Sequence, residues 1–232
     1  MTAGDIRPAG MQDISAIQKI IDSVWPNSGT SGDRIVNVLN DSTHATLVYE
    51  NVDEIAGFVD GFLTTTANGI KRWELDLLAV QPAFQRQGIA SKLIAADTSL
   101  GQLRGAKIAR GLVAFDNLGS QGAFARCGYE TDGEICELLV ANSGHKLGED
   151  FESGLAADYV RVKTINYSGI WIEGQRTKTR LEVALNHLMN SQDDLAGTVV
   201  PEHETEVIKV AKSLGFESLG RYQWWQRSLV EP

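Results

Sequence analysis

The sequence predicts an α/β protein, with a mixed sheet flanked by helices and a smaller partial repeat of the same arrangement. Short apolar segments alternate with amphipathic segments, which is typical of strands and helices that share one sheet. A polar, glycine-rich stretch at 141–158 separates two such series. The segments CGYETDG (127–133) and LGFESLG (214–220) match in pattern, each after an expected helix and before an expected strand, which favours a divergent duplication.

The first series begins with a clear amphipathic helix, MQDISAIQKIIDSVW, whose isoleucines recur at helical spacing. The run WELDLLAV (73–80) is bulky, apolar and short, as expected for a buried strand. The expected order is a strand at 6–9, helices at 11–25 and 33–39, strands at 45–50, 55–66 and 73–80, a helix at 88–100, a strand at 107–115, a helix at 118–127 and a strand at 135–140.

The second series repeats this alternation over a shorter length. We expect strands at 159–166 and 168–173, a helix at 177–190, a strand at 196–200, a helix at 203–214 and a strand at 217–227. The predicted organisation is a first domain at 1–141, a linker at 142–158 and a degenerate partial repeat at 159–232.

The composition is that of an ordinary globular protein, with 232 residues of which 43% are hydrophobic and 22% charged. No apolar run reaches the length of a membrane span and the start lacks a secretory pattern, so we expect a cytoplasmic protein without a membrane partner. A net charge of −9 without a basic cluster argues against nucleic-acid binding and weakly favours a cationic substrate. The two cysteines and four histidines show no ligand spacing, so no metal is expected, and the histidines are expected at the surface.

Residues 80–94, VQPAFQRQGIASKLI, connect a strand to a helix through a loop. Pro82 ends the strand because it has no N–H to donate, and the helical spacing begins after Gly88. A helix start leaves N–H groups unpaired and carries partial positive charge, and a residue without a side chain lets a bulky anion approach. The stretch is therefore either an anion site, to which Arg86 adds a charge, or an ordinary surface turn.

Two motifs in this half resemble those of the GNAT acetyltransferase family. The first is a strand ending in V-x-P followed by Q-x-x-G-x-A at a helix start, here Val80-Gln81-Pro82 and Gln85-Arg86-Gln87-Gly88-Ile89-Ala90. The second follows in order, at Asn117, Ser120, Ala123, Phe124, Gly128 and Tyr129. The resemblance is specific over 73–130 and extends over 5–140, whereas the second half is similar only to a degenerate copy.

The resemblance implies that acetyl-CoA is the cosubstrate. Backbone N–H groups of residues 85–91 would hold its pyrophosphate, and two strands, ending near Val80 and Phe115, would splay to admit the pantetheine arm. One N–H group of residues 78–80 would stabilise the thioester oxyanion. The residues expected to bind the cosubstrate are Leu78, Ala79, Val80, Gln85, Arg86, Gln87, Gly88, Ile89, Ala90, Ser91, Asn117 and Phe124.

Two acidic residues of the strand at 73–80 are candidates for the general base. Glu74 stands where several family members carry theirs, and on an ideal strand Glu74, Asp76, Leu78 and Val80 share one face. Asp76 is a second candidate, as base or as anchor for a cationic group, and Glu74 could instead simply face solvent at the strand start. Phe124 occupies the position of the family's frequent general acid, a tyrosine, and Tyr129 is expected in the core.

The resemblance implies an N-acetyltransferase that moves an acetyl group from acetyl-CoA to a primary amine, of a small metabolite or of an exposed amino group such as that of a peptide, by direct attack. The alternative is a non-catalytic acyl-CoA-binding or sensing protein, which Phe124 and the degenerate second half favour. In that half Glu204 stands at the Asn offset and Q-x-x-G-x-A is missing, so we expect residues 159–228 not to bind coenzyme A. They would extend the sheet, cap the substrate cleft or form a homodimer surface.

Overall fold

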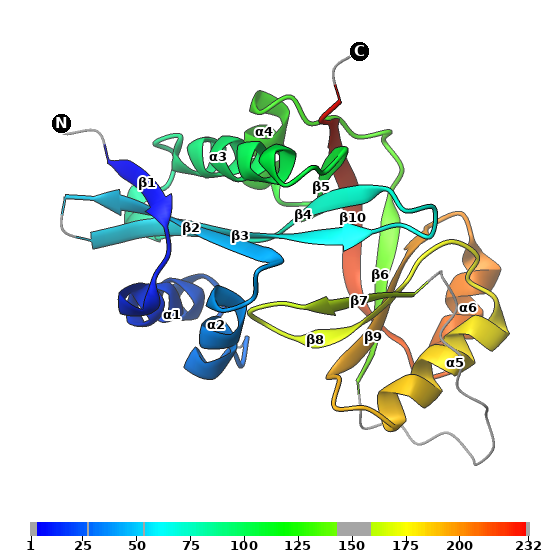
Figure 1. Cartoon of the computed structure of the whole chain (residues 1–232). Coiled ribbons are helices and arrows are strands. Elements are labelled where there is room, and N and C mark those ends of the chain that lie inside the picture. The colour runs from blue at the N-terminus through cyan, green and yellow to red at the C-terminus, as the bar shows by residue number, and fades with distance from the viewer. Residues whose placement is uncertain (1–3, 27, 53, 143–158, 231–232) are drawn as a thin grey trace.

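The computed structural model describes residues 4–26, 28–52, 54–142 and 159–230. Helices lie on both sides of the first half's strands (Figure 1). The elements of this half are β1 (Asp5–Pro8), a 3-10 turn (Met11–Asp13), α1 (Ile14–Val24), α2 (Gly32–Leu39), β2 (His44–Asn51), β3 (Glu54–Thr65), β4 (Lys71–Val80), a second 3-10 turn (Pro82–Phe84), α3 (Ile89–Leu103), β5 (Ile108–Ala114), α4 (Leu118–Arg126) and β6 (Cys136–Asn142).

The second half repeats the series that runs from β3 to β6. Its elements are β7 (Tyr159–Lys163), β8 (Ser168–Ile172), α5 (Lys178–Met189), β9 (Leu195–Pro201), α6 (Thr205–Ser213) and β10 (Glu217–Ser228). In both series an antiparallel hairpin leads through a helix to a strand parallel to the hairpin's second strand, as β4 and β5 pair in the first half and β8 and β9 in the second. The structure thus confirms the internal repeat that the two seven-residue segments predict.

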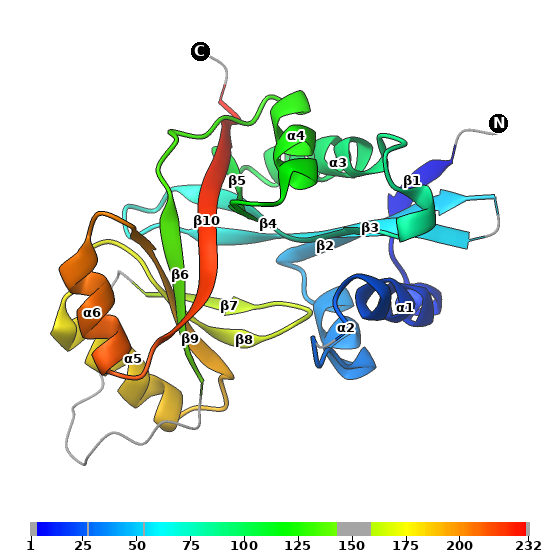
Figure 2. The same ribbon diagram turned by 180° about the vertical axis from the view of Figure 1, so that it is seen from behind.

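The two halves exchange their last strands within one continuous sheet. The strand order is β1-β2-β3-β4-β5-β10-β6-β9-β8-β7, so β10 pairs with β5 of the first half and β6 pairs with β9 of the second. The exchanged strands β6 and β10 also pair with each other at the centre (Figure 2). Because each half supplies a strand to the other, the second half extends the sheet as expected and is tied to the first by backbone hydrogen bonds.

The sheet bends strongly, so that one face is concave. Helices α3 and α4 cover the outer face of the first half, and α5 and α6 cover that of the second (Figures 1 and 2). The hairpin of β7 and β8 curls back until β7 contacts β3. Apolar residues of the central strands, among them Leu112, Leu138, Val199 and Trp224, face the inside of this bend. The concave side is the natural place for a cavity shared by both halves.

The repeated seven-residue segments end α4 and α6 in the same way. Gly128 and Gly215 both have a positive φ, 75° and 95°, a backbone conformation that glycine adopts without a Cβ clash. Each is followed by a buried aromatic residue, Tyr129 or Phe216, that packs under the helix it terminates. The two segments therefore share one structural role, in which a glycine with positive φ ends the helix and the next, aromatic residue packs in the core.

The expected elements are confirmed, with bounds that differ by a few residues at some ends. The domain boundaries at 141 and 159 stay a prediction, and residues 143–158 of the expected linker lie outside the described residues. The expectation of surface histidines is wrong for His44, which is 6% exposed because its Nδ1 bonds the buried Asp60 carboxylate at 2.9 Å. None of the helices formed by the described residues is long and apolar enough to cross a membrane.

Candidate active site

Strands β4 and β5 separate after a short parallel ladder. They pair only from Arg72 with Ile108 to Glu74 with Arg110, although β4 continues to Val80. Neighbouring strands of a continuous ladder would stay about 4.8 Å apart, so the missing pairs mark an opening in the sheet. The splayed strands that the sequence predicts are therefore present.

Backbone groups of β4 point into this opening. The N–H of Gln81 bonds Ala56 O of the β3 side at 2.9 Å. Since N–H groups of successive strand residues alternate in direction, those of Leu78 and Val80 point the other way, toward the opening, and that of Ala79 points to β3. Of the three residues expected to contact the pantetheine arm, Leu78 and Val80 have the free donors.

Helix α3 begins at the end of the opening with an uncapped first turn. Its N-cap, Gly88, has a φ of 79° and open space where a Cβ would lie. Arg86, two residues earlier, also has a positive φ of 62°, so the loop turns its backbone sharply. Among the described residues, no acceptor binds the N–H groups of Gly88, Ile89 or Ala90. Free donors at a helix start form an anion site without further help.

A cavity of about 380 Å³ lies over this helix start. The sequence predicts five of its lining residues in the loop and the helix start, namely Gln85, Arg86, Gly88, Ile89 and Ala90. Arg126 at the end of α4 also lines it, with Nε 3.2 Å from Ser91 Oγ, and adds a second guanidinium that sequence reasoning missed. Its position in the second motif, one turn after Ala123 and two residues after Phe124, is the signal that could have predicted it. Gln87 and Ser91 of the expected set do not line this cavity.

A second cavity of about 650 Å³ continues along the opening between β4 and β5. It shares Leu78, Asn117 and Ser120 with the first, so the two form one cleft. Asn117 caps α4 by accepting the N–H of Ser120 on its side-chain oxygen at 3.1 Å. Phe124 lies on the wall of this cleft, 4% exposed. Both residues are where the sequence predicts them.

A β-bulge at Asp76 changes which side chains of β4 share a face. Gly61 pairs with Leu75 and Asp60 with Leu77, so Asp76 is the extra residue. Before the bulge Leu75 packs under α3, whereas after it Leu77 packs on the α1 side and Val80 returns to α3. The expectation that Glu74, Asp76, Leu78 and Val80 share one face is thus wrong beyond the bulge.

Asp76 stands where the cleft meets a third cavity, a chamber of about 290 Å³. The Asp76 side chain is exposed to both cavities, although protein atoms pack densely around it on its other sides. Burial raises the pKa of Asp76 to about 7, and the nearby charge of Asp60 adds to the effect. A carboxylate with this pKa can exchange a proton near neutral pH.

Glu74 also lines the chamber, but arginines hold its carboxylate. Oε2 accepts from Arg110 Nε at 2.7 Å, and Oε1 accepts from the Thr64 hydroxyl at 2.6 Å and lies 3.2 Å from Arg72 Nε. Both arginines in turn bind Glu173 of the second half, at 2.9 Å and 2.6 Å. Although burial opposes it, the hydrogen bonds from Arg72 and Arg110 hold the pKa of Glu173 below its usual value. We call Arg72, Glu74, Arg110 and Glu173 the ionic cluster.

The second half supplies one wall of the chamber. It contributes the aromatic rings of Tyr167 and Trp171, the carboxylate of Glu173 and the guanidinium of Arg176. Trp224 of the exchanged strand β10 forms part of the floor, with the Arg110 guanidinium 4.1 Å from its ring. The second half therefore covers one side of this cavity, and its role as a cap over a substrate stays a prediction. Trp225 instead packs toward α3 and α4.

Tyr167 occupies the junction of the cavities, close to Asp76. Its hydroxyl oxygen accepts from Trp171 Nε1 at 3.0 Å, and it lines both the cleft and the chamber. Burial, followed by the charge of Asp76, raises the pKa of Tyr167 well above its usual value. Tyr129, by contrast, is 2% exposed and bonds the Thr98 hydroxyl at 2.6 Å, so the prediction of a core residue is confirmed.

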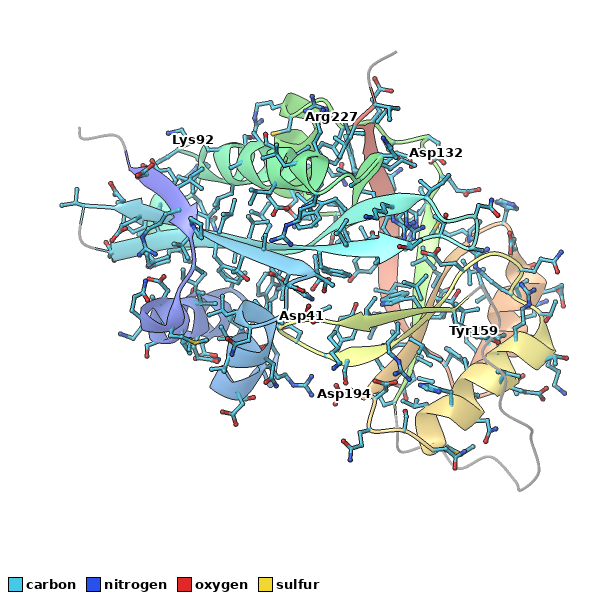
Figure 3. The ribbon with its side chains drawn as sticks, in the orientation of Figure 1. Asp41, Lys92, Asp132, Tyr159, Asp194 and Arg227 are labelled. Atoms are coloured by element: carbon cyan, nitrogen blue, oxygen red, sulfur yellow. The ribbon has the colours of Figure 1, made fainter. Side chains whose placement is uncertain are left out.

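A fourth and more polar cavity of about 1070 Å³ lies between α2 and the β7–β8 hairpin, and Tyr167 lines it too. Two of its acidic residues, Asp41 and Asp194, are labelled in Figure 3 on either side of that hairpin. Asp194 accepts from Arg34 Nη2 of α2 at 2.8 Å and from the Ser168 N–H at 2.7 Å. This contact is a second polar tie between the halves.

Comparison with known structures gives relatives of the same fold at low identity. A GCN5-related N-acetyltransferase from Sphaerobacter thermophilus matches with a TM-score of 0.65 and 11% identity, over 100% of this chain and 97% of that one. A tandem GNAT protein from the clavulanic acid biosynthesis pathway gives a TM-score of 0.59 and 12% identity, over 99% of each chain. A glucosamine N-acetyltransferase region of a fungal β-N-acetylglucosaminidase gives 0.62 and 12%, over 97% of this chain and 38% of that one. No curated protein matches the sequence.

These matches agree with a protein built from two copies of one fold. The family model described as the acetyltransferase (GNAT) family matches residues 14–129, which is half of the chain and includes the opening, the α3 start and Asn117. On this match and on the geometry of the cleft, the chain belongs to the GNAT family of acetyl-CoA-dependent acetyltransferases.

Proposed function

We propose that this acetyltransferase acetylates a primary amine, which enters the chamber between the two halves while acetyl-CoA occupies the cleft. The observation that carries the proposal is the position of Asp76, which borders both cavities and has a pKa of about 7. A base at the meeting point of two cavities can take a proton from a group in one as that group attacks a carbon in the other.

The cleft suits the cosubstrate at both of its ends. Free N–H groups of the α3 start, together with Arg86 and Arg126, would bind the pyrophosphate. The N–H groups of Leu78 and Val80 would bind the pantetheine arm, and that of Leu78 lies on the Asp76 side, where it would stabilise charge on the thioester oxygen. Acetyl-CoA supplies the acetyl group as a thioester, and the remaining steps belong to side chains of this chain.

Asp76 is the better candidate for the general base than Glu74. The Glu74 carboxylate already accepts hydrogen bonds from Thr64 and Arg110, so both of its oxygens are engaged with the protein. Desolvation of the Asp76 carboxylate, followed by the charge of Asp60, raises its pKa and makes proton uptake favourable. We assign proton acceptance to Asp76, and to Glu74 the placement of Arg110 in the chamber wall.

Tyr167 is our candidate for the donor that protonates the leaving thiolate. Phe124 has no proton to give, whereas the Tyr167 hydroxyl borders the cleft and keeps its proton at neutral pH. Its oxygen accepts from Trp171, so its own O–H is free to donate. The second half would thereby supply a group that the first half lacks.

A coenzyme A release assay with a panel of amines tests the proposal. Wild-type kcat/KM is expected to rise with pH and to level off above about 7, because only the deprotonated Asp76 accepts a proton. Asp76→Asn should lower kcat about 100-fold and remove this rise, with unchanged acetyl-CoA affinity by calorimetry. Glu74→Gln is the control for the other carboxylate and should keep the rise. A rise that survives in Asp76→Asn and is lost in Glu74→Gln would reverse the two roles.

Two further outcomes separate the enzyme from a sensor. Tyr167→Phe should lower kcat about tenfold, while Tyr129→Phe, which changes a tyrosine outside the cavities, should leave kcat unchanged. Tight acetyl-CoA binding without turnover of any amine would favour a non-catalytic acyl-CoA-binding protein.

A further inference from the structure

One cation in the chamber wall has no carboxylate partner. Arg176 lines the chamber from the end of the loop between β8 and α5, directly before the Thr177 N-cap, and is half-buried. Within the described part of the chain, no aspartate or glutamate lies within ion-pair distance of it. Arg110, the other guanidinium that lines the chamber, is paired with Glu74 and Glu173. A half-buried guanidinium facing a cavity is therefore left for something that enters it.

The Arg176 side chain is held in place from behind. Its Nε lies 3.2 Å from Thr198 Oγ1, to which it donates, and that hydroxyl donates to Ile172 O at 3.1 Å. Thr198 is fully buried on β9, so this contact fixes the inner edge of the guanidinium. Among the described residues, no acceptor binds its two terminal nitrogens, which is the arrangement that binds a carboxylate bidentately.

A charge balance of the chamber leaves two opposite charges. The ionic cluster is neutral, because Arg72 and Arg110 balance Glu74 and Glu173. Asp76 and Arg176 remain as one anion and one cation. Asp76 stands at the cleft end, since it also lines the cleft, whereas Arg176 lines only the chamber among the four cavities described.

The wall between these charges is apolar and aromatic. Side chains of Phe62, Leu112, Val162, Trp171, Val199 and Trp224 line it. We infer that the acceptor is a zwitterion of the amino-acid or peptide class, with its amine at Asp76, its carboxylate on Arg176 and an apolar body against the tryptophans. Arg176 is a single unpaired guanidinium, so it balances only one negative charge, and the negative charge of Glu173 lies close by in the wall. Both facts favour a carboxylate over a phosphate as the bound group.

This inference rests on the proposed function and is tested with matched acceptors. The probes are amino acids and dipeptides that contain phenylalanine or leucine, each assayed beside its C-terminal amide. Wild type should prefer the free carboxylate at least tenfold in kcat/KM. Arg176→Gln should abolish that preference through KM, and Arg176→Lys should retain part of it. Acetyl-CoA affinity and thermal midpoint should stay those of wild type.

Binding of the acetylated products gives a readout without turnover. N-acetylphenylalanine should bind wild type more tightly than its amide by calorimetry, and Arg176→Gln should bind the two alike. Turnover of amines with equal preference for acids and amides in wild type would overturn the inference and leave the acetyltransferase proposal standing. If no amine of any class is acetylated and neither product binds, both fail.

Discussion

In the first half, β4 continues from Leu75 to Val80 without a partner in β5, whereas in the second half β8 ends at Ile172 while still paired with β9. The helix that follows β4 starts at a glycine with free N–H groups. The helix that follows β8 is capped by Thr177, whose hydroxyl oxygen accepts the Arg180 N–H at 3.4 Å. The same series of elements thus leaves β4 and β5 apart in one half and keeps β8 paired with β9 to its last residue in the other.

The difference shows that an anion site requires backbone N–H groups that the fold leaves without an acceptor. The second half keeps the packing of the fold, including the glycine and aromatic turn after α6, because its core requires them. It lacks the uncapped helix and the split sheet, and it contributes side chains to the chamber instead. In our proposal, this copy no longer binds the cofactor and still shapes the site of the amine.

The largest expected effect compares one glycine from each half, Gly88 at the start of α3 and Gly174 in the loop between β8 and α5. Gly88 and Gly174 both have a positive φ, 79° and 72°, so valine at either position carries similar backbone strain, about 1–3 kcal/mol. Gly88→Val should weaken acetyl-CoA binding about 100-fold or more, since the side chain would stand in the open space over the helix start. Gly174→Val should leave acetyl-CoA binding unchanged by calorimetry. Equal losses in both variants would erase the distinction between the halves.

A smaller effect is expected where the halves meet in the ionic cluster. Glu173→Gln leaves Arg72 and Arg110 with one carboxylate fewer and should lower the free energy of unfolding by about 1–3 kcal/mol, measured in urea. Glu202→Gln, which breaks the exposed pair with Arg221, is the control and should cost less than about 1 kcal/mol.

The same variant should also be less sensitive to acid. The folded pKa of Glu173 lies below the ordinary value of 4.5, so its contribution is present above 4.5 and is lost as the pH falls through the folded pKa. The stability difference between wild type and Glu173→Gln should therefore shrink below about pH 4.5. A difference that is constant down to pH 3 would mean that the cluster does not stabilise the charged form.

The smallest effect compares the N-caps of α4 and α6. Asn117 accepts the Ser120 N–H, whereas Glu204 at the equivalent position makes no side-chain cap bond. Asn117→Ala should lower the free energy of unfolding by about 1 kcal/mol and Glu204→Ala by less than about 0.5 kcal/mol. Equal costs in urea unfolding would show that the carboxylate stabilises α6 as well as a cap does.

Much of this site could be read from the chain because its parts are local. The helix start around Gly88 and the cap at Asn117 depend on neighbours within a few residues, so motif and spacing predict them. Arg126 was missed because its contact with Ser91 joins two helices that the motif describes separately. The face of Asp76 was assigned wrongly beyond the bulge, since a bulge depends on pairing with β3 and leaves no clear signal in β4 itself.

The sequence alone determined the family, the order of the elements, the internal repeat and the loop with an uncapped helix start, because periodicity and backbone chemistry depend on residues that are close along the chain. Only the tertiary structure decided that the halves exchange strands and that Glu173 neutralises the arginines beside Glu74. It also decided that Asp76 and Arg176 share one chamber. The physical reason is that charge balance and pKa depend on which groups meet across the fold, a hundred residues apart along the chain.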